Sequence, residues 1–392
     1  MPSFCIGFLR PSRFLIALAL ACAAIIVSAV VSARTSSLWA SQTTCNPPHP
    51  HATGSFSNET FTTSNAVQRE YNLHVPSSYT GNQAMPLVFS LHGFTSNNFQ
   101  QDLYSELPAK AQEAGFILVT PQGLPTAEGF PHWNSNQLPS PEPDDVAFVD
   151  ELLSELQSQL CIDPARVFAT GISNGGFMSS RLACSLSNRI AAIAPVAGTL
   201  FFDSCSSRAV PVIAFHGTND LLVPFGPIEA TVIPAWAAHN GCAGPAAENP
   251  LTGTTGVRLV RYDGCVDGAT VELYVVFDAD LGTPGDQGGG HAWPGSTLVV
   301  PPPYDAIVGL TTHEIRANDL MWDFFLAHPL PNAPKPVNGP LSVGGFWLQP
   351  RAGELKAQTG GAPDFLTGLA LAVVAGAVAL GAVWYARRAE SH

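Results

Sequence analysis

The chain has 392 residues, of which 46% are hydrophobic and 12% are charged, and its formal net charge at pH 7 is −13. A chain this acidic, with no basic stripe, is not expected to bind nucleic acid, because phosphates need Lys and Arg side chains to neutralise them. No internal repeat divides the sequence, so we predict one domain, over residues 65–330, between two apolar ends.

The N-terminal end has the pattern of a secretory signal. Arg10 and Arg13 precede an uncharged apolar run over residues 14–31, and small residues that suit a cleavage site follow it. We therefore predict a signal peptide over residues 1–33; an uncleaved signal anchor is the alternative, because the apolar run is long for a signal peptide. Residues 34–64 are rich in Ser, Thr, Pro and Asn and are predicted to be an N-terminal lead-in.

Short apolar runs alternate with helical stretches through the predicted domain. Runs that indicate strands lie at residues 69–75, 86–91, 116–120, 167–170, 190–196 and 211–215. Helical periodicity covers residues 145–160, a helix begins near Gly176, and Thr311 with Glu314 resembles a capping box at the start of the last helix. This alternation predicts a mostly parallel sheet with helices on both faces.

The segment Gly171-Ile172-Ser173-Asn174-Gly175 has the strongest functional pattern in the chain. It is a G-x-S-x-G turn with an apolar strand before it and a helix after it, which is the arrangement of a nucleophile elbow in serine hydrolases. The two glycines let the strand and the helix pass closely, and the sharp turn lifts the serine hydroxyl above the sheet. Ser173 is therefore predicted to be a nucleophile; an ordinary loop serine is the alternative.

A serine nucleophile needs a histidine base and a carboxylate that orients it, and in this arrangement the acid and then the histidine follow the serine. Asp220 follows an apolar run, so it is the predicted acid; a turn aspartate is the alternative reading, and Asp263 and Asp278 are the rival acids. His291 is the predicted base, because glycines surround it in a flexible loop. The other later histidines lie in helical or terminal positions: His239, His313, His328 and His392.

The oxyanion that forms during acyl transfer needs two N–H donors. We predict the backbone N–H of Asn174, which follows the nucleophile, and that of Phe94, which lies in the loop after the strand at 86–91. Gly93 lets the backbone of this loop come close to the site. His92 is expected to be a structural loop residue and not a second base.

Six of the eight cysteines lie outside the predicted signal peptide, an even number that suggests disulfide bonds in an exported chain. Six cysteines allow fifteen pairings. Local spacing favours Cys184 with Cys205 and Cys242 with Cys265, which leaves Cys45 with Cys161. No C-x-x-C pair is present, so no metal site is predicted.

Several runs spread over the domain match one known family. The runs are Leu91-His92-Gly93, residues 166–175, His216-Gly217-Thr218 with Asp220, and residues 289–295. In combination they resemble the secreted polyhydroxybutyrate depolymerases and feruloyl esterases, over about residues 65–330. The resemblance implies an α/β-hydrolase fold with Ser173 as nucleophile, Asp220 as acid and His291 as base.

The same resemblance extends to substrate contacts, with two departures. Trp133 is similar to a family aromatic near the substrate pocket, with interior packing as the alternative, and His92 and Trp293 are the other candidates. The stretch over residues 278–288 is longer than the family's usual connection to the histidine and is expected to reshape the pocket. No substrate-binding module follows the domain, which favours soluble or oligomeric esters over a polymer.

The C-terminal end has the pattern of a membrane anchor. Residues 331–362 are rich in Pro and Gly and are predicted to be a linker. The uncharged apolar run that follows is long enough to cross a bilayer core of roughly 30 Å at about 1.5 Å per residue. We predict a transmembrane helix over residues 363–386 and a cytoplasmic tail over residues 387–392, with a removable sorting tail as the alternative.

These patterns predict an exported, membrane-tethered serine carboxylic ester hydrolase that acts on feruloyl-type or hydroxyalkanoate-type esters outside the cytoplasm. It is expected to need no cofactor, no metal and no obligate protein partner. An acyltransferase or a serine peptidase on the same fold is one alternative, because a fold does not determine the acceptor. A catalytically inactive homologue that binds at the cell surface is the other.

Overall fold

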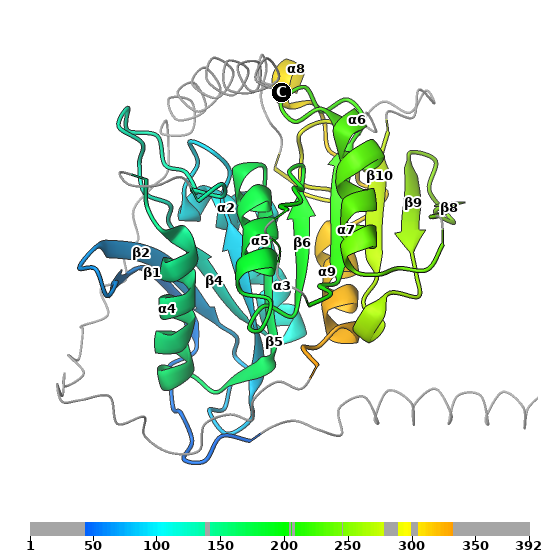
Figure 1. Ribbon diagram of the computed structural model, residues 1–392. Coiled ribbons are helices and arrows are strands. Elements are labelled where there is room, and N and C mark those ends of the chain that lie inside the picture. The colour runs from blue at the N-terminus through cyan, green and yellow to red at the C-terminus, as the bar shows by residue number, and fades with distance from the viewer. Residues whose placement is uncertain are drawn as a thin grey trace, which may run out of the picture. The chain divides into compact units, whose positions relative to one another are not determined.

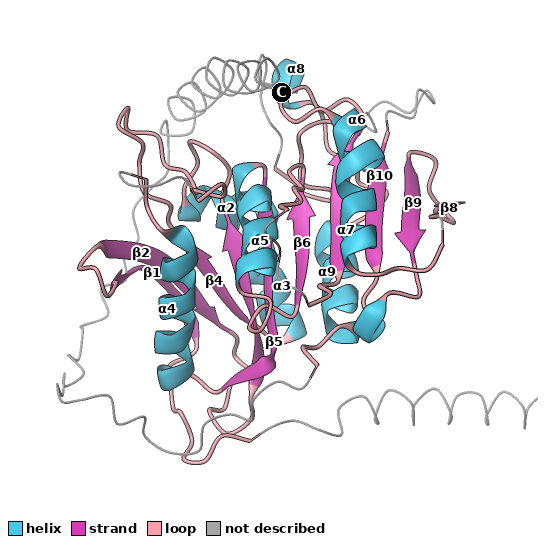
Figure 2. Ribbon diagram, in the orientation of Figure 1, coloured by secondary structure: helices cyan, strands magenta, loops and turns pink. Residues whose placement is uncertain are grey.

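The computed structural model contains a ten-stranded sheet with helices on both faces (Figures 1 and 2). The described residues are 44–137, 142–203, 205, 208–244, 246–277, 289–298 and 305–331. They all belong to one unit of the chain, Thr44–His392. The signal peptide, the linker and the tail that the sequence predicts lie outside the described residues, as does the long stretch over residues 278–288.

The strand order is β1-β2-β4-β3-β5-β6-β7-β10-β9-β8. The strands are β1 (Gly54–Thr62), β2 (Gln68–Val75), β3 (Met85–Leu91), β4 (Ile117–Pro121), β5 (Ile162–Ile172), β6 (Ala192–Val196), β7 (Val212–Gly217), β8 (Ala247–Pro250), β9 (Val257–Tyr262) and β10 (Val271–Val276). From β4 to β10 in this order every neighbouring pair is parallel, whereas the pairs at the two edges are antiparallel. Because parallel strands end at the same edge of the sheet, the loops after β3, β5, β7 and β10 gather there.

Helices cover both faces of the sheet, as the alternation in the sequence predicts. The helices are α2 (Asn98–Ser105), α3 (Leu107–Ala114), α4 (Asp145–Gln159), α5 (Asn174–Ser185), α6 (Phe225–Pro227), α7 (Ile233–His239), α8 (Asp305–Val308) and α9 (Ala317–Ala327). Short helical turns of other types are η1 (Ile228–Val232) and η2 (Val266–Gly268). Figure 1 shows α4, α5 and α7 on the near face and α3 and α9 on the far face. The predicted α/β-hydrolase architecture with a mostly parallel sheet is confirmed.

The central strands are buried on both faces, which explains their continuous apolar sequences. In β3, Leu87 and Phe89 belong to the core that α4 and α5 cover, whereas Val88 belongs to the core that α3 and α9 cover. Alternate residues of a strand point to opposite faces, so each central strand supplies both cores. On the far face, Phe168 of β5 stacks on Phe325 of α9 with ring centroids 4.4 Å apart.

Disulfide bonds brace the described residues. They are Cys45–Cys161, Cys184–Cys205 and Cys242–Cys265. The last two are the pairs that local spacing favours in the sequence, and the first is the pair that they leave. Cys45–Cys161 joins positions 116 residues apart, so it ties the beginning of the described chain to the residue before β5.

The predicted fold class is wrong in one respect, the transmembrane helix. In the part of the chain that the structure describes, no helix combines the length and the apolar sequence that crossing a membrane requires. Residues 363–386, on which the sequence placed that helix, lie outside the described residues.

The last helix also begins later than the sequence pattern predicts. The helix α9 starts at Ala317, because the two residues of the expected capping box make tertiary contacts instead. Thr311 Oγ1 donates to the carbonyl of Trp293 at 2.7 Å, and the carboxylate of Glu314 accepts from the N–H of Gly256 at 2.7 Å. This segment therefore fastens two loops to the body instead of capping a helix.

Candidate active site

Ser173 lies on a strained turn between β5 and α5. Its φ of 57° and ψ of −121° place a non-glycine residue in a sparsely populated region, at a cost of about 1–3 kcal/mol. The surroundings hold it there: its N–H donates to the carbonyl of Val196 at 2.9 Å. A Cβ added to Gly171 would lie 2.5 Å from the carbonyl oxygen of Leu91, and one on Gly175 would also meet that carbonyl. The two motif glycines are thus required by close backbone approach.

Asp220 and His291 form a buried hydrogen-bonded pair. Nδ1 of His291 lies 2.8 Å from Oδ2 of Asp220, and the two residues are 7% and 4% exposed. The other carboxylate oxygen accepts from the N–H groups of Leu222 and Val223 at 2.9 and 2.8 Å. Because the carboxylate only accepts, His291 donates from Nδ1 and keeps its Nε2 lone pair free to take a proton.

The charge state of Asp220 follows from these partners. Burial alone would raise the pKa of its carboxyl group. The interactions with His291 and His216 and the hydrogen bond from the N–H of Val223 together outweigh burial, so the pKa of Asp220 falls below its ordinary value. The group is therefore an anion at neutral pH, as orienting a histidine base requires.

The glycines before His291 let its loop thread between two other segments. A Cβ on Gly290 would meet the carbonyl of Val308, and a Cβ on Gly217 would meet the carbonyl of Gly289. The N–H of His291 donates to that same Val308 carbonyl at 2.5 Å. Backbone crowding thus requires small residues on both sides of the loop and sets the direction of the imidazole.

The sheet brings the three predicted catalytic residues to one edge. Ser173 follows β5, Asp220 follows β7 and His291 follows β10, and these strands are all parallel. The loop after β3 reaches the same place, since a Cβ on Gly93 would lie 3.5 Å from the Cβ of Ser173. The edge is therefore where the chain concentrates its reactive groups.

The two predicted oxyanion donors border the serine. Within the described residues, neither the N–H of Phe94 nor that of Asn174 has a hydrogen-bond acceptor. Asn174 is the first residue of α5, so its N–H also lies at the positive end of a helix dipole. Phe94 is next to Gly93, whose close approach to Ser173 is described above. Phe94 and Asn174 therefore stay the predicted donors of the oxyanion site.

The carboxamide of Asn174 is locked to the backbone of Trp133. Its Oδ1 accepts from the N–H of Trp133 at 2.7 Å, and its Nδ2 donates to the carbonyl of Trp133 at 3.1 Å. The indole N–H of Trp133 in turn donates to the carbonyl of His92 at 2.9 Å. Trp133 therefore connects the two segments that carry the predicted oxyanion donors, Phe94 and Asn174.

The three candidates for substrate contact are all buried under the site. Trp133, His92 and Trp293 are 2%, 0% and 1% exposed, so none offers a face to a substrate. His92 uses both ring nitrogens internally, on the carbonyl of Gly93 at 2.8 Å and the N–H of Gly123 at 2.9 Å, and burial lowers its pKa to about 4. The three side chains therefore shape the loops around the site from below.

Trp293 is anchored by polar groups on three sides. Its indole N–H donates to Oδ1 of Asn318 at 2.9 Å, and its backbone N–H donates to the hydroxyl of Tyr104 at 3.0 Å. Its carbonyl accepts from Thr311. Because Trp293 lies two residues after His291, this anchoring holds the histidine loop in place.

A buried ion pair that the sequence does not reveal supports the Trp133 segment. Arg69 and Asp145 are 2.7 Å apart with almost no exposed surface, and Asp145 also accepts from the N–H of Asn134 at 2.7 Å. Burial raises the pKa of Asp145, although the charge of Arg69 acts to lower it. The partners are 76 residues apart and carry no motif, so only the fold identifies them.

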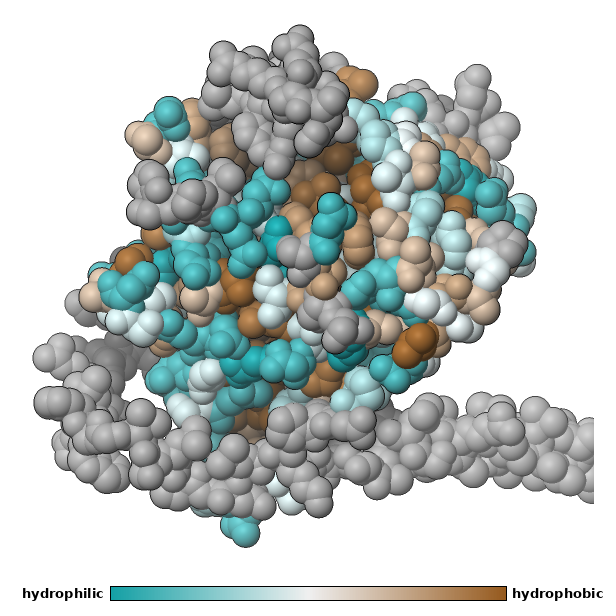
Figure 3. All heavy atoms as spheres, in the orientation of Figure 1, coloured by the Kyte–Doolittle hydropathy of each residue, from teal (hydrophilic) through white to brown (hydrophobic). Residues whose placement is uncertain are grey.

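The sequence patterns also do not identify Phe130, a half-buried aromatic residue near the site. The ring of Phe130 lies 6.1 Å from that of Phe94, centroid to centroid, and both rings are partly exposed beside the oxyanion loop. Figure 3 shows hydrophobic side chains gathered near the top of the view, over the carboxyl ends of the parallel strands. This edge thus combines apolar surface with the polar groups described above.

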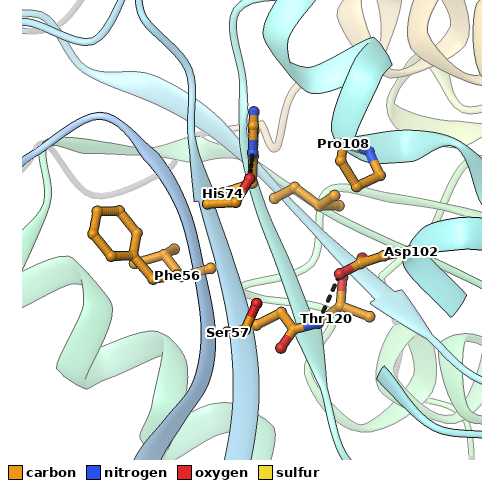
Figure 4. A pocket seen from close by; sticks show the side chains of 10 residues that line it. Phe56, Ser57, His74, Asp102, Pro108 and Thr120 are labelled. Carbon is orange, nitrogen blue, oxygen red and sulfur yellow. Dashed lines mark hydrogen bonds between the residues drawn. The ribbon is translucent and has the colours of Figure 1, made fainter. Parts of the chain in front are cut away.

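A small polar cavity lies elsewhere and contains none of these groups (Figure 4). Its lining includes Phe56, His74, Asp102 and Thr120, and its volume is about 30 Å³. Such a space accommodates water but not an ester. In the described part of the chain, no three His, Cys, Asp or Glu side chains are grouped as metal ligands.

Comparisons with known proteins found similar esterases. No family model matches the chain. It is 29% identical over 269 residues to probable feruloyl esterase C of Aspergillus niger, which covers 66% of this chain and 84% of that protein. It is 32% identical over 240 residues to feruloyl esterase D of Neurospora crassa, which covers 57% of this chain and 77% of that protein. The acetyl xylan esterase from Aspergillus awamori aligns with a TM-score of 0.45 at 15% identity, over 57% of this chain and 93% of that one.

Proposed function

Since the chain belongs to the feruloyl esterase family and is a carboxylic ester hydrolase, we propose that it cleaves its substrate through an acyl-enzyme on Ser173. The support for this route is the strained serine turn together with the buried pair of Asp220 and His291. These two features come from opposite halves of the domain, and nothing in a merely structural role requires both at one sheet edge.

In the first half-reaction, Nε2 of His291 takes the hydroxyl proton of Ser173 while Oγ bonds to the ester carbonyl carbon. The carbonyl π electrons move onto oxygen, and the N–H groups of Phe94 and Asn174 stabilise that oxyanion. When the intermediate collapses, the bond to the alcohol oxygen breaks and the alcohol leaves with the proton from His291. Asp220 stays ionised throughout and stabilises the imidazolium.

In the second half-reaction, water replaces the alcohol. His291 takes a proton from the water, and the oxygen bonds to the acyl carbon to give a second oxyanion in the same N–H pair. Collapse then breaks the bond to Ser173, which recovers its proton from His291, and the free acid leaves.

The single observation that carries the proposal is the hydrogen bond between Asp220 and His291. It joins two side chains 71 residues apart, both buried, with the carboxylate held in its charged form. A buried charge is costly unless it is paired, so a structural role alone would favour apolar residues there. The pair suits a base that must become positive during the reaction.

For the substrate, we propose esters of aromatic acids of the hydroxycinnamoyl class. The relatives named above are feruloyl esterases, and the half-buried rings of Phe94 and Phe130 border the oxyanion loop of this chain. Aromatic rings favour stacked or edge-to-face contacts with another ring. An aromatic acyl group can meet these rings while its carbonyl occupies the oxyanion site.

We also propose that the enzyme works outside the cytoplasm. The disulfide bonds in the described residues are the support, because such bonds persist in oxidising compartments and are rare in the cytosol. Fractionation of the producing cells, with detection of the enzyme by antibody, tests this directly. Enzyme found only in the cytosol would contradict it.

The decisive kinetic experiment compares two serine variants on p-nitrophenyl acetate. Ser173→Ala is expected to lower kcat by at least roughly 10³-fold, because no other group supplies the attacking oxygen. Ser185→Ala, at the exposed end of the same helix, is the matched control and should retain wild-type kcat. Full activity of Ser173→Ala would refute the proposed route.

A further inference from the structure

His216 lies beside the acid–base pair but has no part in the reaction described above. It belongs to β7, and its side chain is fully buried. Its Nε2 lies 2.8 Å from the carbonyl oxygen of Val223 and 3.4 Å from Oδ2 of Asp220. That same Oδ2 accepts from His291, so two imidazoles face one carboxylate oxygen.

The surroundings define the protonation state of His216. Both oxygens near Nε2 only accept hydrogen bonds, so Nε2 carries the proton. Nδ1 has no hydrogen-bond partner among the described residues, which suits the bare lone pair of a neutral ring but would leave a second N–H unpaired. Burial lowers the pKa of His216 despite the nearby charge of Asp220. The ring is therefore a fixed, neutral donor.

The hydrogen bond to Val223 connects β7 to the turn that carries the acid. Oδ1 of Asp220 accepts from the N–H groups of Leu222 and Val223, so the carboxylate and the turn form one unit. The turn projects into solvent, since Leu221 is 70% exposed. His216 attaches this unit to a strand in the centre of the sheet, where backbone movement is small.

We propose that His216 is a positioning residue that holds Asp220 opposite His291 through its Nε2–H. It does so by fixing the carbonyl of Val223 and by offsetting part of the carboxylate charge. The inference rests on the proposed function, because it takes Asp220 and His291 as the acid and the base. The titratable side chains that face this carboxylate in the described residues are His291, His216 and Tyr104.

Two substitutions distinguish the effect of losing the Nε2–H donor of His216 from the effect of losing its imidazole ring. The side-chain amide of His216→Gln reaches the position of Nε2 and can still donate to Val223. The amide of His216→Asn reaches only the position of Nδ1 and cannot. Both side chains are polar amides that remove the imidazole ring. Each variant is therefore the control for the other, because they differ in whether the amide reaches Val223.

The measurement is kcat and KM of both variants on p-nitrophenyl acetate. In His216→Asn the Nε2–H donor is lost, so Asp220 is held less firmly opposite His291. We expect kcat to fall about tenfold and KM to stay nearly unchanged. His216→Gln should restore most of kcat.

Equal kcat values for the two variants would overturn the inference, even if both were less stable than wild type. Should His216→Asn not fold, ¹⁵N NMR of the wild-type imidazoles gives an independent test. The signal of His216 should report a neutral ring protonated on Nε2 at about pH 7. A proton on Nδ1, or a protonated ring, would contradict the inference.

The experiments distinguish a failure of the His216 inference from a failure of the proposed acyl-enzyme route. If Ser173→Ala retains activity, the acyl-enzyme route is refuted whatever the His216 variants do. If Ser173→Ala is inactive and the two His216 variants behave alike, the catalytic pair stands and only the positioning role of His216 is refuted.

Discussion

Trp133 and Asn174 exchange two hydrogen bonds, with the N–H of Trp133 donating to Oδ1 at 2.7 Å and Nδ2 donating to the Trp133 carbonyl at 3.1 Å. This pairing resembles one rung of a β-ladder made with a side chain. It fixes the residue directly after the elbow serine, whose backbone N–H is one of the two proposed oxyanion donors. The side chain of Asn174 thus has a task separate from that of its backbone.

Asn174→Ala should therefore lower kcat about tenfold and leave KM nearly unchanged. The backbone N–H remains, but it is no longer held in place for an oxyanion that exists only during the reaction. Steady-state kinetics on p-nitrophenyl acetate measures both constants. Asn188→Ala, at an exposed position after the same helix, is the control. An unchanged kcat would show that the carboxamide does not position the donor.

Phe130→Ala should weaken binding of aromatic esters selectively. Its half-buried ring lies 6.1 Å from that of Phe94, so its removal opens one side of the proposed acyl site. We expect KM for methyl ferulate to rise about tenfold, the loss of roughly one aromatic contact. KM for p-nitrophenyl acetate, whose acyl group is too small to reach, should stay the same. A parallel rise for both esters would exclude a specific aromatic site.

Asp220→Asn should abolish most activity and change the acid stability. At neutral pH we expect kcat to fall roughly 10⁴-fold, because an amide cannot hold the required tautomer of His291 or stabilise its positive form. Asp263→Asn is the control, since Asp263 is the exposed rival acid. Similar losses in the two variants would refute the assignment of Asp220.

The acid dependence of stability follows from the same carboxylate. The pKa of Asp220 in the folded protein lies below its ordinary value of 3.8. Its charge therefore stabilises the native state above pH 3.8, and this contribution is lost as the pH falls through the folded value. Between about pH 5 and pH 3, the free energy of unfolding of wild type should fall more steeply than that of Asp220→Asn. Denaturant titrations at several pH values provide the comparison.

Arg69→Met should cost about 3 kcal/mol of stability or more at neutral pH. The substitution leaves the buried carboxylate of Asp145 without its partner, and breaking a buried pair from one side is strongly destabilising. The deficit should shrink at low pH, where Asp145 takes up a proton. Urea denaturation measures the free energy of unfolding in each case.

Two further variants make the Arg69 prediction specific. Adding Asp145→Asn should recover part of the loss, because the amide is neutral and still accepts from the N–H of Asn134. Arg316→Met removes an exposed arginine and should change stability by no more than about 0.5 kcal/mol. If the double variant were as unstable as the single one, unpaired charge would not be the cause.

The sheet and the loops around Ser173 and His291 can largely be predicted from the sequence, because local patterns of glycine and apolar residues determine them. The glycines around Ser173 and before His291 are there because backbone segments approach closely, and that requirement is visible in the chain. The alternation of apolar strands and helices likewise indicates the parallel sheet. Its parallel edge then explains why Asp220 and His291 meet although they are far apart in the chain.

The sequence does not predict whether a side chain in a loop points into the protein or toward solvent. Trp293 and His92 stand in motif runs next to the reactive groups, yet both are buried, because indole and imidazole rings serve as well for packing as for substrate contact. Thr311 and Glu314 have the spacing of a helix cap but bond to distant loops. Strand β1 lies within the predicted lead-in, because an edge strand with mostly exposed residues has little apolar pattern.

The proposal that Ser173 is the nucleophile is tested most directly by labelling with a fluorophosphonate probe, followed by mass spectrometry of the modified peptide. Such probes react with a serine only when a base activates it. We predict one adduct, on Ser173, that is absent from Ser173→Ala and strongly reduced in Asp220→Asn. An unlabelled wild-type enzyme, or an adduct on a different residue, would contradict the central claim.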